Sequence, residues 1–136
     1  MTTDRRPTPP TAVAGPCASW PADKGEGIRQ IVERAGDKWT VLVIGALELG
    51  PLRYTELQGL VPGISQRMLT RTLQHLRRDG MVTRTAYAEV PPRVVYELTD
   101  LGRALIEAVT VLVDWAGRHH DQIQHNRAAF DHESDT

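Results

Sequence analysis

The sequence predicts a mainly helical α/β domain in which a helix-turn-helix is followed by a β-hairpin and a long C-terminal helix. Three observations predict this fold. Residues 66–79 carry leucines at helical spacing between a good N-cap and a glycine. Residues 82–98 hold two β-favouring runs separated by Pro-Pro, and residues 100–127 repeat apolar side chains at steps of three and four. A chain of 136 residues can bury one core of this kind.

The N-terminal segment differs in composition from the rest. Residues 1–23 hold five of the nine prolines among Thr, Ala and charged residues, which cannot bury enough apolar surface to offset chain entropy. We therefore expect a disordered arm over 1–23, a folded domain over 24–128 and a flexible tail over 129–136.

Two helices should open the domain. Ile28, Ile31 and nearby apolar residues recur on one helix face up to Gly36, which ends that helix. Asp37 is a good N-cap for the next helix, where apolar residues after Trp39 occur almost all round. We expect this second helix to be the most buried element.

The helix-turn-helix follows. Thr55 and Gln58 have the spacing of a capping box, which predicts a short helix that Pro62-Gly63 ends. Ser65 is a good N-cap for the next helix, and Gly80 supplies a left-handed residue to stop it. One side of that helix carries Leu69, Leu73 and Leu76. The other side carries polar residues: Arg67, Thr70, Arg71, Gln74 and Arg78.

The hairpin should have a stiff tip. Val82 to Ala88 and Val94 to Leu98 favour strands, while Pro91-Pro92 cannot continue a ladder. We expect Arg84 and Arg93 to flank the tip, where each can reach a phosphate or the minor groove.

The last helix looks longer than the domain needs. Thr99 is its N-cap, and a helix from Asp100 to about Arg127 would span roughly 40 Å. We expect a second copy to cover the excess, although the helix could instead pack wholly over the first helix of its own chain. The expected dimer contacts are Ile28, Ile31, Leu105, Val109, Leu112 and Trp115.

Charge is distributed unevenly, although the formal net charge is only −1. Between Arg53 and Tyr96 there are seven arginines against three acidic residues, whereas from Asp114 onward five acidic residues oppose two arginines. The hairpin side should therefore face an anionic partner such as double-stranded DNA, and the C-terminal end should face away.

An α-helix fits the major groove, and Arg, Thr and Gln hydrogen-bond base edges and phosphates. An ordinary solvated helix face is the alternative. The residues expected to contact bases are Gln66, Arg67, Thr70, Arg71 and Gln74. Those expected to anchor the DNA backbone are Thr55, Ser65, Arg78, Arg84 and Arg93.

Four motifs recur in an order that resembles one family: Gly36–Thr40, Gly50–Tyr54, Pro62–Leu69 and Val90–Val94. Over about residues 26–120 the chain is similar to HxlR-type winged helix-turn-helix transcriptional regulators. The resemblance implies a homodimer that binds an inverted repeat near promoters, with residues 66–79 as the recognition helix. We expect repression.

One departure concerns redox sensing. Many family members carry a sensing cysteine about a dozen residues before the motif tryptophan, near Gly25 or Glu26 here, whereas Cys17 lies 22 residues before Trp39. Two alternatives remain: a sensor acting through Cys17 or through a small-molecule effector pocket at the dimer interface, and an adaptor that never specifically binds DNA. We expect a cytoplasmic protein without membrane segment, cofactor, metal site or enzymatic activity.

Overall fold

The computed structural model describes residues 24–134, which belong to two compact units. The predicted arm over residues 1–23, with Cys17, lies outside the described residues. The first unit contributes helix α1 (Gly25–Ala35), which ends at Gly36 as predicted. Arg29 Nη2 lies 2.8 Å from Glu26 Oε1 in its first turns. None of its residues is buried, and Ile31 and Val32 are each more than half exposed.

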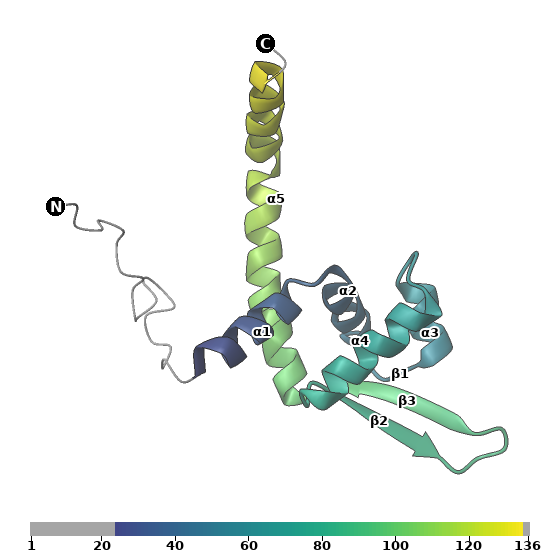
Figure 1. The fold of residues 1–136 in the computed structure, drawn as a ribbon. Helices are drawn as coiled ribbons and strands as arrows, with labels where there is room; N and C mark the ends of the chain where they lie inside the picture. Colours follow the sequence, from purple (N-terminus) through teal and green to yellow (C-terminus); the bar gives the residue numbers. More distant parts are fainter. Residues whose placement is uncertain (1–23, 135–136) are drawn as a thin grey trace. The chain divides into compact units, whose positions relative to one another are not determined.

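The second unit begins at Asp37 and contains all the other elements (Figure 1). In chain order these are α2 (Lys38–Leu47), β1 (Leu52–Arg53), α3 (Tyr54–Leu60), α4 (Gln66–Arg78), β2 (Val82–Tyr87), β3 (Arg93–Leu98) and α5 (Asp100–Ser134). The predicted fold is confirmed. Strand β1 was not predicted; it pairs antiparallel with β3, so the hairpin becomes a three-stranded sheet of order β1-β3-β2.

The core lies where α2, α3, α4 and the sheet meet. It is made of 14 buried hydrophobic residues: Val43, Ile44, Leu47, Leu57, Val61, Ile64, Leu69, Leu73, Leu76, Met81, Val82, Tyr96, Leu98 and Val109. Helix α2 is buried on one face and not all round, because Leu42 stays 40% exposed. Trp39 packs partly against the core, with Lys38 Nζ 4.5 Å from the ring centroid.

The N-caps predicted for α2 and α5 are confirmed, and the one predicted for α3 is not. Asp37 Oδ1 accepts hydrogen bonds from the amides of Trp39 and Thr40, at 3.0 and 3.1 Å. Thr99 Oγ1 accepts from the amide of Gly102 at 3.2 Å. The cap predicted at Thr55 is wrong. Helix α3 starts two residues earlier, directly after β1, with Arg53 as its N-cap, and Glu56 Oε1 accepts from the Arg53 amide at 2.9 Å.

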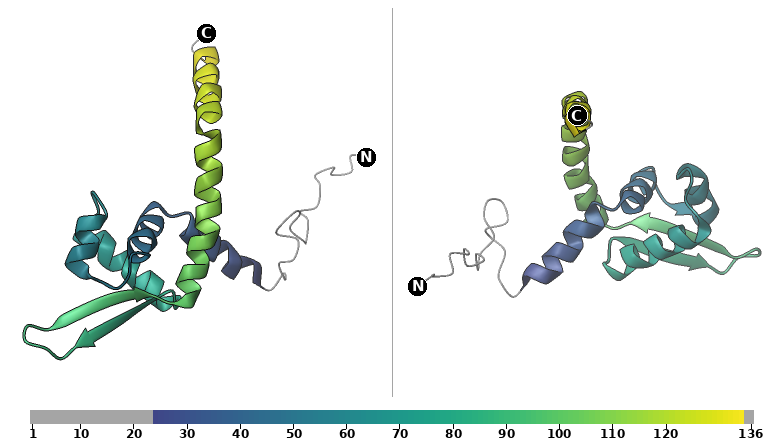
Figure 2. Two further views of the ribbon diagram at one scale, coloured as in Figure 1. Left: turned by 180° about the vertical axis from the view of Figure 1, so that it is seen from behind. Right: turned by 45° about the horizontal axis from the view of Figure 1, so that its top comes forward.

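Helix α5 is longer than predicted. It continues past Arg127 to Ser134, so residues 129–134 are helical and not a flexible tail; no glycine or proline interrupts this stretch. Its 35 residues span roughly 50 Å. Figure 2 shows that its C-terminal half extends away from the other elements of the second unit. None of the helices within residues 24–134 combines the length and the apolar character that a membrane span requires.

One predicted dimer contact is corrected by this packing. Val109 is only 8% exposed and belongs to the core of its own chain, so it is not available to a partner. Leu105 is partly buried against the same core. Farther along α5, Leu112 is 57% and Trp115 49% exposed.

Candidate nucleic-acid interface

Helix α4 is held by its apolar side. Leu69, Leu73 and Leu76 are buried, as the sequence predicts, and they fix the helix against the core. The predicted cap is also present, because Ser65 Oγ accepts from the Met68 amide at 3.1 Å. At the other end Gly80 adopts a positive φ of 76°, which a side chain disfavours, and turns the chain into β2. Both ends of α4 are therefore set by local chemistry.

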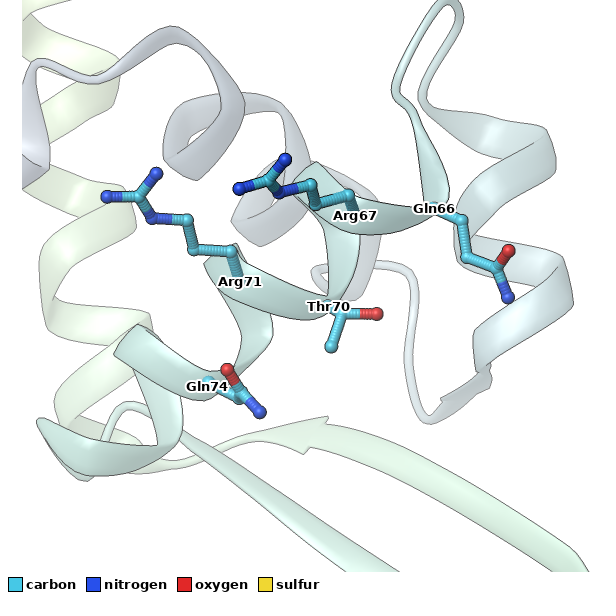
Figure 3. Close-up of a pocket in the computed structure, with 5 residues that line it drawn as sticks. All are labelled: Gln66, Arg67, Thr70, Arg71 and Gln74. Carbon is cyan, nitrogen blue, oxygen red and sulfur yellow. The ribbon is translucent and has the colours of Figure 1, made fainter.

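The opposite side of α4 is polar and open. All five residues predicted to contact bases are exposed and line one shallow depression: Gln66, Arg67, Thr70, Arg71 and Gln74. Figure 3 shows the side chains of Arg67 and Arg71 extending together, away from those of Gln66 and Gln74. Within residues 24–134, no carboxylate forms an ion pair with either arginine. Both guanidinium groups are thus available to an anionic ligand.

A second group of cations lies where α4 meets β2. Arg77, Arg78 and Arg84 line a second shallow depression together with Gln74, Val82 and Thr83. Arg84 pairs with Tyr96 in the ladder, so it sits in the stem of the hairpin and not beside the tip as predicted. Arg77 was not among the predicted DNA contacts, although its position one residue before Arg78 could have indicated it. The three cations extend the polar surface of α4 onto the hairpin.

Arg93 lies at the tip end of the hairpin, opposite Tyr87. Its Nη2 is 3.0 Å from Glu89 Oε1, and its guanidinium stacks 4.3 Å from the centroid of the Tyr87 ring. Only a third of the side chain is exposed. Arg93 therefore braces the tip, and its charge is already partly compensated, in contrast to the free anchor that was predicted.

These features have counterparts in known proteins. The model of the HxlR-like helix-turn-helix family matches residues 34–124, which include every element from α2 to the middle of α5. The chain belongs to the HxlR-like helix-turn-helix family. Its members are DNA-binding transcriptional regulators. In a helix-turn-helix the second helix is the one that enters the major groove, and α4 is the second helix of this motif.

Individual relatives agree with this assignment. An uncharacterized HTH-type transcriptional regulator of Methanothermobacter thermautotrophicus is 43% identical over 95 residues, which cover 70% of this chain and 72% of that protein. Among solved structures, the redox regulator HypR in its reduced form superposes with a TM-score of 0.66 at 33% identity, covering 73% of this chain and 98% of that one. Diamide-treated YodB from Bacillus subtilis superposes with a TM-score of 0.62 at 33% identity, covering 68% of this chain and 91% of that one.

One contact between α3 and α4 of this HxlR-like regulator could not be predicted from the sequence. The hydroxyl of Tyr54, the first residue of α3, lies 2.8 Å from the Gln66 carbonyl oxygen and 3.0 Å from Thr70 Oγ1. Tyr54 thus ties the first helix of the motif to the recognition helix. Thr55 is exposed in the first turn of α3, where the first helix of such motifs crosses the DNA backbone.

Proposed function

We propose that this HxlR-like regulator binds DNA as a homodimer, with α4 of each copy in the major groove of one half of an inverted repeat. The observation that carries the proposal is the open polar face of α4, flanked on one side by the cations of the hairpin stem. If the α4 face were only a solvated helix surface, there would be no reason to expect a second group of arginines beside it that have no acidic partner within residues 24–134. A symmetric dimer doubles the few base contacts that one recognition helix can make.

Within this surface we assign base contacts to α4. Arg67 and Arg71 lie on adjacent turns, and arginine pairs bidentately with guanine O6 and N7. Gln66 and Gln74 carry amides that match adenine N6 and N7. The remaining base contact falls to Thr70. These five residues form the part of the surface that should determine sequence preference.

Backbone contacts are assigned to the margins of the same surface. Arg77 and Arg78 end α4, and Arg84 lies beside them in β2; none of the three has a carboxylate partner within residues 24–134. Ser65 and Thr55 are exposed near the N-terminal ends of α4 and α3. Residues that touch phosphates fix the position of a protein on DNA without distinguishing sequences.

Helix α5 is the proposed dimerisation element. Beyond the core, Leu112, Ala116, Ile123 and Phe130 follow one another at steps of four, seven and seven residues, which places them on one side of the helix, with the polar His119 and Asn126 between them. Leu112 and Phe130 are more than half exposed in the single chain. Exposed apolar residues in this regular pattern are typical of a surface that a partner covers. The apolar face of α1, with Ile28 and Ile31, is a second candidate contact.

Selection of bound fragments from random duplex DNA by the purified protein tests the proposal. We expect a recovered inverted repeat. Arg71→Ala should then lose about 1–3 kcal/mol on the selected site and little on a scrambled one. Arg78→Ala is the matched comparison from the same helix. It should weaken binding to both DNAs and lower the salt slope by about 0.9. Absence of any enrichment would favour the adaptor alternative and contradict the proposal.

A second candidate function is redox sensing, because the similar protein HypR is a redox regulator. Cys17 is the sole cysteine, and its nearest following cation is Lys24, so the sequence around it offers little to lower the thiol pKa. We therefore expect Cys17→Ser to bind DNA like the parent, with or without diamide. If diamide releases the parent protein from DNA and leaves Cys17→Ser bound, Cys17 is the sensor.

A further inference from the structure

The hydroxyl of Tyr54 makes two hydrogen bonds on the recognition surface. Its oxygen lies 2.8 Å from the carbonyl oxygen of Gln66 and 3.0 Å from Thr70 Oγ1. Gln66 is the first residue of α4, and Thr70 is one turn farther along the same exposed face (Figure 3). All three residues therefore belong to one chain of hydrogen bonds between α3 and α4.

The direction of these hydrogen bonds is fixed by the available protons. A carbonyl oxygen can only accept, and a tyrosine hydroxyl has a single hydrogen to donate. Because the hydrogen of Tyr54 is used on the Gln66 carbonyl, the contact with Thr70 requires Thr70 to be the donor. The hydroxyl hydrogen of Thr70 then points back to Tyr54, and only the lone pairs of Oγ1 and the methyl group remain for a ligand.

We infer that Tyr54 determines which bases Thr70 can contact, by making Thr70 a hydrogen-bond acceptor in the major groove. This inference rests on the proposed function of α4. A threonine free to rotate could donate to guanine or thymine or accept from adenine or cytosine. With its hydrogen engaged by Tyr54, Thr70 can accept only from the amino groups of adenine N6 or cytosine N4. Tyr54 is thus a positioning residue and Thr70 a specificity-determining one.

The test compares three proteins in the same selection from random duplex DNA: the parent, Tyr54→Phe and Thr70→Val. Both substitutions keep the shape of the side chain. In the parent, one position of each half-site should favour adenine or cytosine on one strand by roughly 3- to 10-fold, the effect of one hydrogen bond. Tyr54→Phe should reduce that preference to within about twofold or shift it to guanine or thymine. Thr70→Val should abolish it at the same position, and preferences elsewhere should persist.

The outcomes separate this inference from the proposed function. If the parent enriches no sequence, the proposed function fails and the inference fails with it. If the parent enriches an inverted repeat and Tyr54→Phe recovers the same preference at every position, only the inference is overturned. A uniform loss of affinity in Tyr54→Phe would likewise overturn it, because Tyr54 would then only hold α3 against α4. Should Tyr54→Phe fail to fold, Thr70→Val decides: unchanged preferences at all positions would refute the role of Thr70.

Discussion

The contact between the start of α5 and the turn before β2 gives the sharpest prediction about stability. Gly102 lies in the first turn of α5, and a Cβ at this position would be 2.3 Å from the backbone oxygen of Met81. The same oxygen accepts the Thr99 amide at 3.0 Å, and Thr99 Oγ1 donates to the Gly80 oxygen at 2.7 Å. The turn and the helix cannot both stay in place, so Gly102→Ala must separate them by about 1 Å.

The expected loss follows from three contributions. Alanine is better than glycine in a helix by about 1 kcal/mol, which favours the variant. Overpacking against a rigid backbone costs roughly 1–3 kcal/mol, and each hydrogen bond weakened at Thr99 costs about 0.5–1.5 kcal/mol. With both hydrogen bonds weakened, we therefore expect Gly102→Ala to lower the free energy of unfolding by about 1–5 kcal/mol, measured by urea denaturation followed by circular dichroism.

Gly117 supplies the matched control. It lies in the same helix, and a Cβ there would meet nothing within 4 Å. Gly117→Ala should raise the free energy of unfolding by up to about 1 kcal/mol. All variants are compared at several equal protein concentrations, because dimerisation shifts the apparent stability. If Gly102→Ala proves as stable as Gly117→Ala, the close packing of α5 on the turn is refuted.

Two further predictions concern assembly and DNA affinity. Leu112→Glu should convert the proposed dimer to a monomer in light scattering, and circular dichroism should stay unchanged because Leu112 is exposed in the single chain. Thr110→Glu, on the opposite side of α5, should remain dimeric. Equal behaviour of the two variants would contradict α5 as the dimerisation element. Glu89→Gln should free Arg93 from its ion pair and tighten binding to any duplex by roughly 2- to 10-fold. It should also steepen the salt dependence of DNA binding by up to about 0.9. An unchanged salt dependence would mean that Arg93 never reaches a phosphate.

The features that the sequence predicted correctly depend on short-range signals. Ser65, Asp37 and Thr99 cap helices through bonds to residues two or three positions away, and side-chain chemistry alone suggests such contacts. The division of α4 into a buried and an exposed face follows from helical periodicity. The candidate base contacts could therefore be named before the structure was known.

The features that the sequence missed depend on long-range contacts or on competition between partners. Strand β1 has only two residues, too few for any periodicity, and exists because β3 offers it a pairing edge. The hydroxyl of Tyr54 finds partners 12 and 16 residues away. From the sequence alone, an Arg93 side chain that extends into solvent and one that pairs with Glu89 were equally possible. The extra turns of α5 were missed because a frayed end and a stable helix have similar composition there.

The distribution of charge explains how a protein with a net charge of −1 can approach DNA in one orientation. Nonspecific attraction to DNA grows with the number of cations that reach phosphates, and a nearly neutral protein has little overall attraction. Among residues 24–134, five arginines without an acidic partner lie together on α4 and in the hairpin stem, while the distal part of α5 is acidic. The field of the chain should therefore orient the recognition surface toward DNA and turn the end of α5 away. Because the tip arginine Arg93 is already paired with Glu89, the attraction should be strongest beside the residues proposed to contact bases, which would favour discrimination over nonspecific affinity.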